Sequence, residues 1–158
     1  MRGKVAWAVA CLWITAGCGV GEGDRGERLL SSTVDGSVGD TPFTTSHGVS
    51  VVLDSGTVRT IIGTTGVSCD DAKDGELLPG GTHVVIEVPD ATVGTPSEHF
   101  FTFSVVDGTE STGGGSAQGS VEITAVEGDS ITMTVSFLDT FDDVDYEVFG
   151  DFTAARCP

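Results

Sequence analysis

The chain has 158 residues, 24 of them Asp or Glu and seven Lys or Arg, which gives a formal net charge of −17 at pH 7. A field of this sign repels phosphate backbones and anionic headgroups, so it excludes nucleic-acid binding and attachment to a membrane through a basic face. The length suits one domain with a hydrophobic core and leaves little room for a second.

The first segment in chain order has the pattern of a targeting signal. Arg2 and Lys4 supply a positive start, and Val5 to Ile14 is an unbroken apolar run of ten residues. A membrane-spanning helix needs roughly 20 such residues, so this run is too short to cross a bilayer. We interpret residues 1–17 as a signal peptide.

The end of this segment resembles the cleavage box of bacterial lipoproteins, in which small residues precede a lipidated cysteine. Ala16, Gly17 and Cys18 match the box, whereas Thr15 stands where an aliphatic residue is usual. The resemblance implies that Cys18 carries the palmitate-type acyl chains and becomes the mature N-terminus. It also implies outer-membrane delivery, because Gly19 is not the aspartate that marks inner-membrane retention. The alternative is an ordinary signal peptide cut elsewhere, with Cys18 a free thiol.

The residues after the leader divide into a tether and a domain. Residues 18–33 are rich in glycine and charge with no apolar period, which predicts a flexible tether of roughly 20 Å. Residues 34–158 are predicted to form a single β domain. All 24 acidic residues and five of the seven basic ones follow residue 17, so residues 18–158 carry a formal net charge of −19.

The four cysteines can be assigned once the leader is set apart. Cys11 leaves with the apolar run and Cys18 takes the lipid, so Cys69 and Cys157 remain as a pair. In an oxidising compartment such a pair persists as a disulfide, which we predict here. The alternative, two metal thiolates, lacks the paired C-x-x-C spacing or neighbouring histidines of a zinc site.

The first β-hairpin is predicted around Ser55-Gly56. Val49, Val51 and Leu53 alternate with their neighbours before it, and Val58, Thr60 and Ile62 alternate after it. A two-residue loop pairs Leu53 with Val58 and Val51 with Thr60, which places both apolar sets on one face.

Further strands are predicted at Thr82 to Val88 and at His99 to Val106, followed by a second hairpin. In that hairpin a two-residue loop at Gly128-Asp129 would throw the apolar faces to opposite sides. A three-residue loop, Gly128 to Ser130, pairs Ala125 with Met133 and keeps the faces together.

The last strand alternates through Val144, Tyr146, Val148, Phe152 and Ala154, with Gly150 as a predicted bulge or bend. The glycine-rich segment Thr112 to Gly119 is predicted to be a mobile surface connection. Because no window shows a helical period, we expect an all-β fold: an antiparallel meander of about seven or eight strands forming a sandwich or small barrel with one disulfide. Second-face apolar residues predict burial on parts of both faces: Val52, Ile61, Val85, Phe100, Val126 and Phe149.

Several short motifs together resemble those of small lipoproteins that are abundant in myxobacteria and their relatives. The motifs are Val34 to Gly39 followed by Pro42-Phe43, the mid-chain Cys69, Gly119 to Thr124, and Gly150 to Ala154 running into Cys157 as G-x-F-x-A-x-x-C. The resemblance implies a β fold, a disulfide from mid-chain to the C-terminal region, and surface attachment. It carries no catalytic residues, because these lipoproteins are uncharacterised.

Candidate chemistry is sparse. His47, His83 and His99 fall at predicted turns or strand edges without ligand-like spacing, so we interpret them as surface or edge histidines. Two acidic turns could offer oxygen ligands, although neither follows a calcium-loop pattern. They comprise Asp70, Asp71, Asp74 and Glu76, and then Asp139, Asp142, Asp143 and Asp145.

These observations favour a non-enzymatic, lipid-anchored envelope protein with a structural or protein-binding role. No catalytic residue, metal site or cofactor is predicted, and the envelope partner is unknown. The main alternative is a small β-barrel that binds an apolar ligand, which requires an internal cavity. A calcium-binding adhesion module and a hydrolase built on the acidic turns are further alternatives.

Overall fold

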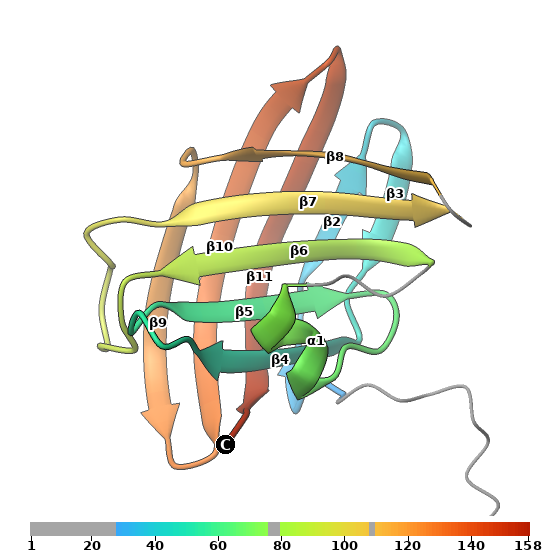
Figure 1. Cartoon of the computed structure of the whole chain (residues 1–158). Helices are drawn as coiled ribbons and strands as arrows, with labels where there is room; N and C mark the ends of the chain where they lie inside the picture. The colour runs from blue at the N-terminus through green and yellow to red at the C-terminus, as the bar shows by residue number, and fades with distance from the viewer. Residues whose placement is uncertain (1–27, 76–79, 108–109) are drawn as a thin grey trace, which may run out of the picture.

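The computed structural model describes residues 28–75, 80–107 and 110–158, which form eleven strands and one short helix (Figure 1). The elements are β1 (Ser31–Ser32), β2 (Asp35–Val38), β3 (Thr41–Thr44), β4 (His47–Val52), β5 (Val58–Gly63), α1 (Cys69–Asp74), β6 (Gly81–Val88), β7 (Phe100–Asp107), β8 (Glu110–Ser116), β9 (Ser120–Glu127), β10 (Ser130–Phe141) and β11 (Val144–Arg156).

The strands form one curled sheet. Its main path runs β3-β2-β11-β4-β5-β6-β7-β8, while β10 pairs with β11 and β9 pairs with β10. The sheet folds over so that β4 to β8 lie across β9, β10, β11, β2 and β3, giving a half-barrel (Figure 1). The predicted all-β fold is therefore confirmed. The expected antiparallel meander needs one correction, because β11 and β4 pair in parallel and the sheet is mixed.

Strand β11 holds the two layers together. One edge pairs with β10 along the whole strand, from Val144 to Ala155. The other edge pairs in turn with β2, β1 and β4. The predicted bulge at Gly150 is absent, because Gly150 pairs with Val135 in unbroken register. A glycine is nevertheless required there, since its φ is +132° and a Cβ would lie 2.5 Å from the Thr33 carbonyl oxygen.

The main core fills the space between the two layers. Alternate residues of β6 and β7 face those of β9, β10 and β11, as their period-two pattern predicts. Aromatic rings meet at the centre: Phe137 packs 4.9 Å from Phe101 and 4.8 Å from Phe103, measured between ring centroids. The buried set includes Val84, Ile86, Val88, Val121, Ile123, Ile131, Met133, Val135, Tyr146, Val148, Phe152 and Ala154.

A smaller core lies on the opposite face of β4 and β5, where α1 covers it. Its buried members are Val49, Val51, Ile61, Val67 and Ala72. The expected second-face burial is thus confirmed for Ile61 but is wrong for Val52 of the same hairpin, which is 48% exposed. Elsewhere the second face is open: Phe100 and Phe149 are 43% and 48% exposed.

The first hairpin differs from its predicted register by one residue. Val51 pairs with Arg59 and Val49 with Ile61, and the Leu53 N–H donates to the Thr57 carbonyl across a three-residue turn. The prediction assumed that both apolar sets share one face. In the structure Val49 and Val51 point toward α1, whereas the alternate residues of β5 point into the main core. Coverage of both faces removes the constraint that fixed the predicted register.

The second hairpin has the two-residue loop that the apolar pattern had rejected. Ser130 pairs with Glu127, and the register then shifts between Thr132 and Met133, so that Met133 pairs with Ile123. This bulge places one extra residue in β9. Because side chains alternate between the two faces of a strand, one extra residue moves the side chains beyond it to the other face. The apolar faces coincide as expected, but the bulge and not the loop length brings them together.

The glycine-rich segment is mostly a strand, which corrects its prediction as a mobile connection. Residues 112–116 belong to β8 and pair with β7 in constant register. Two of the three glycines allow close approach of large rings: a Cβ at Gly114 would lie 2.5 Å from the Phe141 ring, and one at Gly115 would lie 2.8 Å from Phe100. Close packing, and not chain freedom, explains the glycines.

The fold begins earlier than predicted. Residues 28–33 were placed in the tether, yet Arg28 bridges to His47 and β1 pairs with β11. Leu29 packs against the main core. The apolar pattern of this segment is too short to reveal a strand, since two residues cannot show a period. Residues 18–27 lie outside the described residues.

The helix α1 was missed, although the sequence holds its end signals. Ser68 caps the N-terminus in a capping box with Asp71, and Gly75 ends the helix with φ +77°. Six residues are too few to display a 3.6-residue period. The predicted Cys69–Cys157 disulfide is confirmed, with Cα atoms 5.6 Å apart, and it ties the start of α1 to the residue after β11.

Loss of this disulfide should destabilise the fold strongly, because the bond closes a loop of 88 residues. A loop of that length restricts the unfolded chain by about 4 to 5 kcal/mol at 25 °C. Urea unfolding of the Cys69→Ser/Cys157→Ser double variant, compared with the oxidised protein, should show a loss of this order. A loss below about 1 kcal/mol would contradict the expectation.

The turn between β10 and β11 offers a stabilising change. Asp142 and Asp143 have φ values of +51° and +64°, as in a type I′ hairpin turn, which favours glycine at the second position. Asp143→Gly should raise the free energy of unfolding by up to about 1 kcal/mol, because it relieves the left-handed conformation. The matched control Asp145→Gly makes the same change within β11 and should lower stability. An unchanged or lower midpoint for Asp143→Gly would argue against the turn type.

Candidate binding surface

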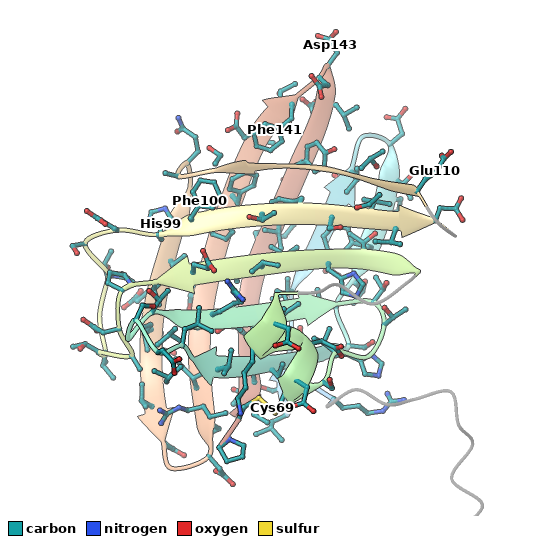
Figure 2. The ribbon with its side chains drawn as sticks, in the orientation of Figure 1. Cys69, His99, Phe100, Glu110, Phe141 and Asp143 are labelled. Carbon is teal, nitrogen blue, oxygen red and sulfur yellow. A yellow bond between two sulfur atoms is a disulfide. The ribbon has the colours of Figure 1, made fainter. Side chains whose placement is uncertain are left out.

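One hollow among the described residues lies beside His99 and Phe100, where β7 begins (Figure 2). It is an open cleft of about 560 Å³. The end of β6 supplies Val88 and Pro89, and the residues before β7 supply Ser97 and Glu98. Thr57 and Ala117 complete its lining.

The cleft combines an apolar floor with carboxylates. Val88 and Pro89 adjoin the half-exposed ring of Phe100, while Glu87 and Glu98 supply the acidic groups. His99 also lines the cleft: its ring packs edge-on against Phe101, and its Nε2 is buried without a hydrogen-bond partner among the described residues. This surface suits a ligand group with an aliphatic stem and a positive head, such as a lysine or arginine side chain.

Two further hollows continue the cleft across the outer face of the sheet. One of about 180 Å³ shares Glu87 with the cleft, and one of about 540 Å³ shares Phe100. These two hollows share Thr102 with each other. The three hollows are therefore neighbours around Glu87, Phe100 and Thr102 and reach β8, and together we call them the outer groove.

An ion pair bounds the outer groove on the side of α1. The Arg59 Nε donates to the Glu87 carboxylate at 2.7 Å, and both side chains are partly buried. The Arg59 Nη1 also donates to the Ala72 carbonyl at 3.1 Å. One guanidinium thus joins β5, β6 and α1. Because Glu87 is paired with Arg59, Glu98 is the other carboxylate of the cleft and can bind a partner.

The histidines do not come together, and two of them are not surface residues as predicted. His47 and His83 are buried, His83 with no exposed surface. His83 lies opposite Ser104, toward the far end of β7 from His99. Its burial arises because the outer face of β6 is covered where Thr65 packs on it.

The protonation state of His83 follows from its hydrogen bonds. The Thr65 hydroxyl donates its single proton to the Gly80 carbonyl at 2.9 Å, so at 3.0 Å it can only accept from His83 Nε2. Nδ1 is then the unprotonated nitrogen, and it has no partner among the described residues. A proton there would place a charge in a buried site without compensation. Burial therefore lowers the pKa of His83 below its ordinary value.

This lowered pKa predicts acid sensitivity. Between the ordinary histidine pKa near 6.5 and the lower folded value, the unfolded chain binds a proton that the folded chain does not, so stability falls as pH falls through this window. One such group contributes a slope of at most about 1.4 kcal/mol per pH unit. Urea unfolding from pH 8 to pH 5 should show a shallower decline in His83→Gln than in the parent chain. Parallel curves would contradict this account.

The two acidic turns are far apart. Asp70 and Asp71 belong to the first turn of α1, where Asp71 serves the capping box. Asp143 lies at the tip of the β10–β11 hairpin, at the opposite end of the molecule from Cys69 of α1 (Figure 2). Glu76 lies outside the described residues. Within the described ranges, no three His, Cys, Asp or Glu side chains gather as a possible metal site.

The predicted lipidation residue Cys18 lies outside the described residues. No helix in the described part of the chain is long and apolar enough to span a bilayer. Comparisons with protein families, with curated protein sequences and with solved structures find no match for this chain.

The sequence did not identify the outer groove as a site. A signal was present, because Phe100 and Val85 are apolar residues on the second faces of their strands. In the structure Val85 packs at the margin of the small core under α1, and Phe100 lies half-exposed in the groove. The length of α1, which decides what remains open, was not predictable from the apolar pattern.

Proposed function

We propose that this protein is exported, anchored to the cell envelope through lipid on Cys18, and serves there as a non-enzymatic binding module for another protein. The leader of residues 1–17 and the small residues before Cys18 support the anchoring. The Cys69–Cys157 disulfide is consistent with an oxidising compartment. The proposal includes delivery to the outer membrane, because Gly19 is not the aspartate that marks inner-membrane retention.

The observation that carries the binding role is the outer groove. It consists of neighbouring hollows over β6, β7 and β8 and contains the exposed Phe100 beside Glu98. An exposed aromatic ring next to a charged group is typical of a protein-binding surface. The formal charge of −19 on residues 18–158 favours a basic partner and opposes a nucleic acid.

The position of the groove suits an anchored protein. The described chain begins at Arg28, which bridges to His47 in β4. Strand β8 lies four strand spacings from β4, or roughly 19 Å along the sheet. An anchor leading to Arg28 therefore joins the domain on the β4 side, and the β8 side lies away from this point of attachment.

The alternative of a small apolar ligand inside the barrel is not favoured. The space between the layers is occupied by aromatic rings, with Tyr146 packed 5.4 Å from Phe103 and 5.2 Å from Phe141. The three hollows described above all open to the outside. We therefore place the ligand surface on the outer face.

Acylation can be tested by labelling cells that express the full chain with radioactive palmitate. Cys18→Ser should abolish label incorporation and shift the protein from the membrane to the soluble fraction. Cys11→Ser is the matched control, because it removes a thiol from the same leader and should keep the label. Label that persists in Cys18→Ser, or a mature N-terminus at another residue, would overturn the anchoring proposal.

A further inference from the structure

The outer groove ends at the edge strand β8, and the hydrogen-bond ladder shows which of its main-chain groups are free. The Thr64 N–H donates to the Thr82 carbonyl at 3.0 Å, so the main-chain groups of Thr82 point toward β5. Because main-chain groups alternate in direction along a strand, those of His83 and of every second residue after it point toward β7. The register is constant from β6 through β7 to β8. The main-chain groups of Thr112, Gly114 and Ser116 therefore point to β7. Those of Ser111, Gly113 and Gly115 point away from the sheet.

This edge lacks the devices that protect the other two. Strand β3 carries Pro42, and the outer edge of β9 is bonded to Gly94, whose N–H and carbonyl both pair with Ile123 at 2.8 and 2.9 Å. Strand β8 holds no proline and no lysine. In the described part of the chain, no main-chain group outside β7 bonds to it. An unprotected edge is a template for an added strand.

The edge also lacks side chains at three successive positions. Gly113, Gly114 and Gly115 expose main chain without a Cβ. Phe141 packs over Gly114 from the inner face, and Phe100 packs over Gly115 from the outer face (Figure 2). The edge is therefore ordered before a partner arrives, which reduces the entropic cost of binding.

Charge identifies the partner. Glu98 lies in the cleft near the Ser116 end of β8, and Asp107 and Glu110 lie at its other end. The described residues near this edge include no free basic group, because Arg59 is paired with Glu87. The ends of the seven-residue strand are roughly 20 Å apart. A second copy of this chain would bring the same acidic groups against each other, so a basic partner fits better than a dimer.

We propose that β8 binds an extended basic segment of about seven residues from a partner protein, which adds to the sheet as a further strand. Its main chain pairs with Ser111, Gly113 and Gly115. One side chain enters the cleft beside Phe100, and basic side chains reach Glu98 at one end and Glu110 at the other. This inference deepens the proposed binding role and rests on it.

The free protein offers the first measurement. Amide hydrogen exchange, followed by NMR on the full chain in detergent, should be fast at Ser111, Gly113 and Gly115. It should be at least tenfold slower at Thr112, Gly114 and Ser116, whose N–H groups bond to β7. Uniform exchange along β8 would contradict the assignment of its free edge.

The second measurement uses a capped eight-residue peptide of alternating lysine and valine as the probe. Binding should slow exchange at Ser111, Gly113 and Gly115 at least tenfold. The same peptide with glutamate in place of lysine should bind at least tenfold more weakly. Methylating the peptide nitrogens that pair with β8 should also weaken binding at least tenfold, because it removes donors without changing charge.

Variants separate the groove from the rest of the surface. Phe100→Ala should weaken binding of the lysine peptide about fivefold to tenfold. Phe149 is a similarly exposed ring on the other layer, and Phe149→Ala should change the affinity for this peptide less than twofold. Glu98→Gln should weaken binding more than Glu122→Gln, an exposed site on β9 that alters net charge equally.

Three results would overturn the proposal. They are equal effects of the paired variants, unimpaired binding of the methylated peptide, and a dimer formed through β8 in the absence of peptide, detected by sedimentation. None of these measurements depends on the lipid. If palmitate labelling fails, the peptide assay can be repeated without detergent, so failure of the anchor and failure of the edge are distinguishable.

Discussion

The fold depends on one strand that serves both layers. Residues of β11 pair with β10 on one edge and, in succession, with β2, β1 and β4 on the other. Its side chains alternate between the core and the outside without interruption, and Gly150 makes this possible where the backbone meets Thr33. Without β11 the two meanders, β4 to β8 and β9 to β10, have no shared ladder. The curvature that opposes their apolar faces follows from this connection.

Much of this architecture was predictable from period-two patterns, because strands with one covered face must alternate. The strands β6, β7, β10 and β11 appear where the pattern places them. Prediction failed where a different constraint acted. The β4–β5 hairpin has both faces covered, so alternation cannot fix its register. In β9 the bulge beside Thr132 and Met133 changes the parity locally, and no composition signal marks it.

Site prediction had a different limit. The disulfide was predictable because Cys69 and Cys157 are the two cysteines that follow residue 18. The outer groove was not predictable. It depends on how far α1 extends across the sheet and on which aromatic rings pack against the glycines of β8. Both features depend on tertiary packing. The sequence held partial signals in Phe100 and in the Ser68 to Asp71 capping box, yet neither could be placed without the neighbouring strands.

The disulfide also has a temporal consequence. Cys157 follows every strand in chain order, so the bond to Cys69 cannot close until β11 has been delivered. The parallel seam between β4 and β11, which involves only Ala155 and Arg156 with their partners, forms at the same late stage. A chain that emerges N-terminus first would therefore remain without this cross-link until β11 had emerged. Oxidation of this pair therefore distinguishes a chain that includes β11 from one that is truncated before it.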